Sequence, residues 1–210
     1  MTLGISFSIK SNLGVSPVSS IPYMITLILG VEMGKATTLF QAFLILLQIL
    51  ILRRNFKLIN LSQLVVAFIF GNMTTFSNGL MAFVPVPETM AIRILMLMIS
   101  ILLVAVGIFL YMPADIMPMA PEGFVQAVSN ATGIALPKGK VIFDVTLVSI
   151  AGIFSLIVLS SFGSVGVGTI FSALLTGTAL NFIMKLLGEK LKGFLYSSGS
   201  PVPSEQEVGS

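Results

Sequence analysis

Five long apolar stretches constrain this chain more than any other feature of its sequence. They cover residues 36–52, 58–83, 89–112, 141–162 and 164–187. A transmembrane helix needs about 20 predominantly apolar residues, so each stretch predicts one full span. Only 9% of the residues are charged, whereas soluble domains carry about 25%. The sequence therefore predicts an all-α, polytopic helical membrane protein with about five full spans.

The chain begins with an apolar segment that is too short to be a span. Residues 1–9 would rise only about 13 Å as a helix, which is less than half of a bilayer. No basic segment precedes it and no cleavage site follows, which argues against a signal peptide. We interpret it as the C-terminal half of a first helix whose beginning is short or missing, natively or through a wrongly assigned start.

Two groups of basic residues predict how the spans are oriented. Arg53, Arg54 and Lys57 follow the first full span, and a lysine group at 185–192 follows the last apolar run. Basic residues next to spans mark cytoplasmic loops. When the first group is cytoplasmic, the alternation of spans places the second group there too, so the C-terminus is predicted to be cytoplasmic. Both groups are too sparse for a nucleic-acid surface.

Two segments between the spans share one layout. Each has a small residue and a proline, Pro17 or Pro121, then about a dozen residues of helical character and a glycine, Gly30 or Gly133. Proline at the start and glycine after the end are the expected punctuation of a helix. The sequence predicts a short helix in each segment, which either re-enters the bilayer or lies on its surface.

The shared layout extends along the chain as an internal repeat. At a shift of about 103 residues, Gly4 matches Gly107 and Asn78 matches Asn181. The predicted organisation is a first repeat at 1–88, a second at 89–196 and a disordered tail at 197–210. Each unit holds three helices besides its short one, and this odd number inverts the second copy in the membrane. Inverted repeats with short helices are typical of secondary transporters.

Polar residues in the short-helix segments and the spans are the candidates for a binding site. Helix N-termini offer unpaired N–H groups, and polar residues within spans usually face the bundle interior. The competing interpretation is that they hold helices together through interhelical hydrogen bonds. The substrate-binding candidates are Asn12, Ser16, Ser19, Ser20, Tyr23, Asn72, Thr75, Asn78, Glu122, Gln126, Asn130, Thr169 and Asn181.

Carboxylates are the candidates for coupling transport to protons, because the chain has no His and no Cys. Asp144 is the acid closest to the interior of a span, and Asp115 lies in the second short-helix segment. The alternative for Asp144 is a local ion pair with Lys140, one turn earlier. Catalytic triads and His or Cys metal sites are excluded, and the carboxylates are too dispersed for an acid–base pair. We expect no enzyme activity, no cofactor and no metal.

Several stretches are similar to a known family. They are LGISFSIKSNLGVSPVSSIPY, QLVVAFIFGNMTTF, APEGFVQAVSNATG, KVIFD and GVGTIFSALLTG. They resemble the YczE/YitT-like family of small bacterial membrane proteins over most of the chain. The resemblance implies a bacterial inner-membrane protein and, because the family is largely uncharacterised, no particular activity. Relatives often carry charged residues where this chain has Gly166, Val167 and Thr75, so a charged site of the relatives can be altered here.

Two functions are consistent with these features. The first is a small secondary transporter that moves a small polar metabolite, with anionic ones among the candidates, by alternating access. The second is a non-transporting scaffold or regulatory partner in the membrane. The partners expected for the first are the lipid bilayer, a small-molecule substrate and, because about six spans enclose a cavity thinly, a second copy in a homodimer. No nucleic acid is expected.

Overall fold

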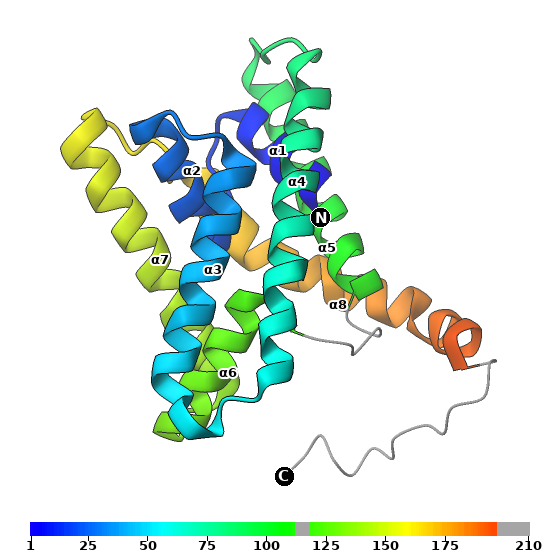
Figure 1. Cartoon of the computed structure of the whole chain (residues 1–210). Coiled ribbons are helices and arrows are strands. Elements are labelled where there is room, and N and C mark those ends of the chain that lie inside the picture. The colour runs from blue at the N-terminus through cyan, green and yellow to red at the C-terminus, as the bar shows by residue number, and fades with distance from the viewer. Residues whose placement is uncertain (112–117, 197–210) are drawn as a thin grey trace.

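The described part of the chain consists of helices and the loops that connect them (Figure 1). The computed structural model describes residues 1–111 and 118–196, apart from the side chains of residues 181, 184 and 187–196. The predicted tail at 197–210 and Asp115 lie outside the described residues. The helices are α1 (Thr2–Ser11), α2 (Pro17–Leu29), α3 (Met33–Leu52), α4 (Gln63–Ala82), α5 (Met90–Tyr111), α6 (Ala120–Thr132), α7 (Leu136–Leu159) and α8 (Val167–Tyr196), with 3-10 turns at Arg53–Asn55 and Leu58–Ser62.

This arrangement confirms the predicted all-α class. Helices α3, α4 with its preceding turn, α5 and α7 are each long and apolar enough to cross a membrane. The fifth predicted span falls on α8, whose described apolar part is Val167–Leu180. Helix α7 begins at Leu136, earlier than predicted, because a proline in the first turn of a helix gives up no helical hydrogen bond.

Both predicted short helices form, and they end in the same way. Helices α2 and α6 each have 13 residues, with a proline in the first turn. Gly30 ends α2 at φ 66° and Gly133 ends α6 at φ 73°, the left-handed conformation that glycine adopts without steric cost. The N–H of Gly30 donates to the Thr26 carbonyl and that of Gly133 to the Ser129 carbonyl. Each glycine therefore turns the chain sharply into the following long helix.

The short helices are part of the packed core. Helix α2 packs against α7 and α6 packs against α3, and the two short helices lie at opposite ends of α3 (Figure 1). Buried residues of all four helices form one hydrophobic cluster: Ile21, Phe40, Leu44, Ile45, Ala120, Val125, Phe143, Leu147 and Ala151. One face of each short helix is therefore buried against a long helix rather than facing lipid headgroups.

The long helices differ in how closely they approach each other. Helices α3 and α4 pack along their length, and they touch through backbone at Gly34 and Gly71. A Cβ atom on Gly71 would lie 2.6 Å from the Gly34 carbonyl oxygen, so glycine allows this contact. Over their described residues, α7 and α8 have no comparable contact. The molecule is thus closed between α3 and α4 and more open between α7 and α8.

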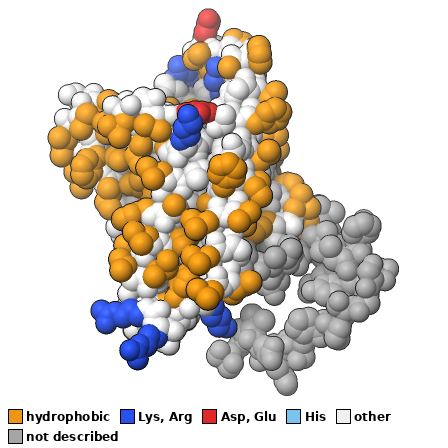
Figure 2. All heavy atoms as spheres, viewed as in Figure 1, with side chains coloured by type: hydrophobic (Ala, Val, Ile, Leu, Met, Phe, Trp, Pro, Cys, Tyr) orange, Lys and Arg blue, Asp and Glu red, His pale blue; other side chains and the backbone are white. Residues whose placement is uncertain are grey.

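The outer surface is that of a protein surrounded by lipid. Large apolar side chains are exposed along all the long helices, and Figure 2 shows them spread over the visible face. Arg53, Arg54 and Lys57 are exposed in the turn between α3 and α4. Figure 2 shows basic side chains towards both ends of the molecule, with apolar side chains covering the part between them. The chain therefore has the surface as well as the helices of a membrane protein.

Candidate functional site

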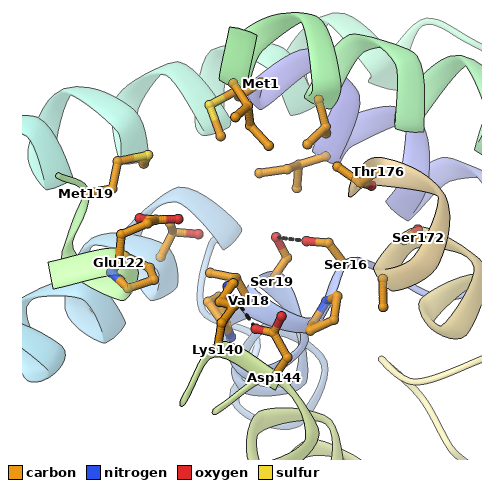
Figure 3. Close-up of a pocket in the computed structure, with 18 of the residues that line it drawn as sticks. Met1, Ser16, Val18, Ser19, Met119, Glu122, Lys140, Asp144, Ser172 and Thr176 are labelled. Carbon is orange, nitrogen blue, oxygen red and sulfur yellow. Dashed lines mark hydrogen bonds and ion pairs between the residues drawn. The ribbon is translucent and has the colours of Figure 1, made fainter. Parts of the chain in front are cut away.

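A cavity of about 400 Å³ lies among the helices and is bordered by residues from all eight of them. Figure 3 shows labelled side chains from α2, α6, α7 and α8 around this space. A cavity of this size is in the range that holds a small organic molecule. Its lining is mainly apolar, with a few polar side chains at defined places. Those polar side chains determine what the cavity can bind.

The N-terminal end of α2 supplies two hydroxyl groups. Ser16 precedes the helix and Ser19 lies in its first turn, and their Oγ atoms are 3.1 Å apart in a hydrogen bond (Figure 3). The loop before α2 is fixed to the start of α8, because the N–H of Gly168 donates to the Leu13 carbonyl at 2.7 Å. This bond brings the serines close to the part of α8 that borders the same cavity.

The N-terminal end of α6 supplies a carboxylate, Glu122, which points into the cavity (Figure 3). The start of α6 is held by two buried amides that sequence reasoning missed. Gln48 Nε2 donates both to Gln63 Oε1 and to the Ala120 carbonyl, each at 3.1 Å. A Cβ atom on Gly123 would lie 2.8 Å from Gln63 Nε2, so the first turn of α6 fits closely against these amides. Helices α3 and α4 therefore position Glu122.

Helix α7 contributes an ion pair to the cavity. Lys140 Nζ donates to Asp144 Oδ1 at 2.9 Å, one helical turn apart (Figure 3). Lys140 Nζ also lies 5.6 Å from the centre of the Phe143 ring, within range of a cation–π contact. The local ion pair weighed against a coupling role for Asp144 therefore forms, and it forms at the cavity wall.

Gln41 of α3 brings an unsatisfied acceptor to the cavity. Its side chain borders the cavity and is only 3% exposed, and its Oε1 atom has no hydrogen-bond partner. A buried acceptor without a partner costs about 1–3 kcal/mol. Thr37, one turn earlier, also borders the cavity but donates its hydroxyl hydrogen to the Met33 carbonyl at 2.7 Å. Gln41 is therefore a polar group that a bound molecule could satisfy.

The environment of Glu122 favours its protonated form. The Glu122 side chain is exposed where it borders the cavity. The helices that surround the cavity nevertheless shield it from bulk water. This burial raises the pKa of Glu122 above its ordinary value of 4.5. The positive charge of Lys140 opposes the rise and the negative charge of Asp144 adds to it. The carboxyl group thus lies where its protonation responds to the neighbouring charges.

The other predicted site residues lie elsewhere. Among the predicted candidates, the cavity collects Ser16, Ser19, Glu122 and Asp144. Asn72 and Thr75 border a second hollow between α3 and α4. Asn181 belongs to α8, but its side chain is outside the described part. The rest do not border the cavity: Asn12, Ser20, Tyr23, Asn78, Gln126, Asn130 and Thr169.

Several of these residues have structural contacts instead. Ser20 is fully buried and donates to the Pro17 carbonyl at 2.6 Å, and Thr169 Oγ1 accepts from the Gly166 N–H at 3.1 Å. Asn72 Nδ2 donates to the Phe68 carbonyl of its own helix, while Gln126 and Asn130 are on the exposed face of α6. These contacts match the alternative in which polar residues stabilise helices and their packing.

Residues 1–185 match the profile of a family of unknown function, DUF6198, and the chain therefore belongs to that family. The resemblance to YczE/YitT-like proteins rests on the sequence motifs alone. No curated protein and no solved structure matches the chain. The function must therefore be inferred from the cavity itself.

Proposed function

We propose that this protein is a small secondary transporter that moves a small polar metabolite across the membrane by alternating access. The observation that carries the proposal is the cavity, which brings Ser16 and Ser19 of one half and Glu122 and Asp144 of the other to a single space among apolar helices. Ionisable residues inside membrane bundles are costly and usually mark a substrate or ion pathway.

The matched positions of the lining residues support an inverted repeat. Ile5 and Ile108 both border the cavity, as do Gln41 and Asp144, and each pair is separated by about 103 residues. Pro17 and Pro121, which begin the two short helices, border it too. The helix contacts show the same correspondence. The short helix α2 of the first half packs against α7 of the second, and the short helix α6 of the second half packs against α3 of the first. A binding site at the interface of two such halves is the arrangement expected of a transporter.

The unequal closure of the two halves supports alternating access. Under the repeat, α3 and α4 correspond to α7 and α8; α3 and α4 are in close contact, whereas α7 and α8 have no comparable contact over their described residues. The cavity is bordered by Val141 of α7 and Ala173 of α8. We infer that this conformation is open between α7 and α8, and that the opposite state closes there while α3 and α4 separate.

The remaining features of the proposal follow from the sequence. We place the protein in the bacterial inner membrane with the α3–α4 turn and the C-terminus in the cytoplasm, on the basis of the basic residues at these positions. We also propose a homodimer, which the mass of the purified protein in detergent would test.

A reversible cross-link tests alternating access directly, because the chain contains no cysteine of its own. On the closed side, a Cβ atom on Gly71 would lie 3.3 Å from Thr38 Cβ. Val141 and Leu174 are the corresponding residues of α7 and α8. If those helices close in the same way, their Cβ atoms come within the roughly 3.5–4.5 Å that a disulfide needs. Val141→Cys with Leu174→Cys should therefore form an intramolecular disulfide in proteoliposomes.

Uptake of a panel of charged and uncharged small metabolites provides the functional readout. Oxidation of the double variant should stop uptake and reduction should restore it, whereas the single variants Val141→Cys and Leu174→Cys should transport regardless of redox state. If no solute moves and the disulfide does not form, the transporter proposal is wrong and a scaffold or regulatory role becomes the better explanation.

A further inference from the structure

The side-chain charges around the cavity are unequal. Glu122 and Asp144 border it, and Lys140 is the one basic side chain among the described residues that does so. Because Lys140 is already paired with Asp144 at 2.9 Å, Glu122 remains, among the described residues that border the cavity, as the acid without an ion pair. Met1 also borders the cavity, and burial lowers the pKa of its α-amino group, which disfavours the charged form.

The polar groups at the cavity wall that are open to a ligand are hydrogen-bond acceptors. Gln41 Oε1 is buried at the cavity wall without a hydrogen-bond donor. Glu122 offers carboxylate oxygens, which accept hydrogen bonds when ionised. It also accepts from a backbone N–H at the start of α6, the place where an anionic ligand would otherwise bind. The cavity therefore matches a ligand that brings hydrogen-bond donors and a positive charge.

The rest of the lining matches an apolar body. Side chains without polar groups form most of the wall, and they come from five helices: Ile5, Phe40, Phe70, Val104, Ile108 and Leu180. A strongly hydrated ion without an apolar part would lose its hydration shell against these side chains and gain little from them. An apolar group attached to the charge would fill this space favourably.

We propose that the cavity binds an organic cation, an ammonium group on a compact apolar body, with Glu122 as its counter-ion and Gln41 Oε1 as a hydrogen-bond acceptor. This inference rests on the proposed transport function, since it names the class of its substrate. An anion of the same size would instead meet two carboxylates and no unpaired basic side chain among the described residues.

The same arrangement makes a proton the natural competitor of the cation. The cation and the proton both bind the ionised carboxylate of Glu122, so each excludes the other, and protonated Glu122 has no charge to offer the cation. The titratable groups that face Glu122 are Lys140 and Asp144 of α7 and Tyr111 at the end of α5. An exchange of one cation for one proton at Glu122 leaves the charge of the site unchanged. We expect cation binding to weaken as the pH falls through the pKa of Glu122.

Three compounds of one shape test the substrate class in the full-length, detergent-purified protein. They are cyclohexylammonium, cyclohexanol and cyclohexanecarboxylate, and the measurement is the shift of the thermal unfolding midpoint at mildly alkaline pH. Cyclohexylammonium should stabilise the wild type most strongly. Glu122→Gln should weaken its binding by roughly ten- to a hundredfold, since a charge-assisted hydrogen bond is lost. Gln41→Leu, which removes the acceptor, should weaken it by a smaller factor.

A matched control is Glu88→Gln, which makes the same change at an exposed site in the loop before α5 and should bind as the wild type does. Because glutamine resembles protonated glutamic acid in shape, Glu122→Gln should fold, and its unliganded unfolding midpoint verifies this. Three results would each overturn the proposed organic cation. They are stronger stabilisation by the carboxylate or the alcohol, no shift with any compound, and unchanged amine binding in Glu122→Gln. The uptake and cross-linking results would still decide the transporter proposal separately.

Discussion

The protonation of Glu122 is coupled to the stability of the fold. Its pKa in the folded protein is raised, so its protonated form stabilises the native state. This contribution is fully present below the unfolded pKa near 4.5 and is lost as the pH rises through the folded pKa. The midpoint of thermal unfolding should therefore fall as the pH rises through this window.

Substitutions of the neighbouring charges should move the upper end of that window in opposite directions. Asp144→Asn removes a negative charge that raises the pKa of Glu122, so the loss of stability should be complete at a lower pH and should be smaller. Lys140→Gln removes the positive charge that lowers this pKa, so the loss should extend to a higher pH and should be larger. Glu122→Gln should abolish this part of the pH dependence. Unfolding midpoints across a pH series measure all three, and shifts in the same direction for both α7 variants would contradict the assignment.

The sequence identified only part of the cavity at this scale. Glu122 and Asp144 could be selected because carboxylates near spans are rare and costly. Gln41 carried the same kind of signal, an amide within an apolar stretch, but its position on α3 relative to α6 and α7 depends on tertiary packing. Ser20 is the opposite case, because it was predicted to bind substrate but does not border the cavity. Its hydroxyl group donates to the Pro17 carbonyl one turn earlier.

At the scale of helices, glycine decides which pairs can close. Gly71 and Gly79 lie on the same helix, α4, but their surroundings differ. A Cβ atom on Gly71 would meet Gly34 and Thr38 of α3, whereas one on Gly79 would meet nothing within 4 Å. Small residues let helices approach closely, but the sequence shows only that both positions are glycine, and the structure separates a contact glycine from an open one.

The same substitution at the two positions should have effects of opposite sign. Gly71→Ala should destabilise the protein by about 1–3 kcal/mol, because the added methyl group forces α3 and α4 apart. Gly79→Ala should be neutral or stabilising by up to about 1 kcal/mol, because alanine favours a helix more than glycine does. Thermal unfolding in detergent compares the two variants. Equal destabilisation by both would argue against the close α3–α4 contact.

At the scale of the whole molecule, the apolar pattern predicted nearly every helix. Residues 36–52 became α3 and residues 89–112 became α5 with small shifts at their ends, because the length of an apolar run is set by the bilayer. The short helices were predictable from their proline and glycine punctuation. The pairing of α6 with α3 was not, since it depends on amides such as Gln48 whose partners are distant in sequence. The close contact of α3 with α4, which α7 and α8 lack over their described residues, was not predictable either, because the apolar pattern describes each helix alone.

The predicted orientation of the whole molecule follows from the ends of α4. Asn55 lies in the turn before α4 and Glu88 in the loop after it, and both are exposed. The helix with its preceding turn has 25 residues, enough to separate the two loops by the width of a bilayer. Because Arg53, Arg54 and Lys57 surround Asn55, the positive-inside rule places that turn in the cytoplasm and Glu88 on the outer side.

Single cysteines in the cysteine-free chain test this orientation in intact cells. A membrane-impermeant maleimide should label Glu88→Cys from outside and should label Asn55→Cys only after the membrane is opened. The unmodified chain, which offers no thiol, gives the background. Labelling in the reverse order would invert the topology and place the α7–α8 opening on the other side of the membrane. It would leave the cavity and its charges unchanged, because these are set by the packing of the helices within the chain and not by which side of the membrane they face.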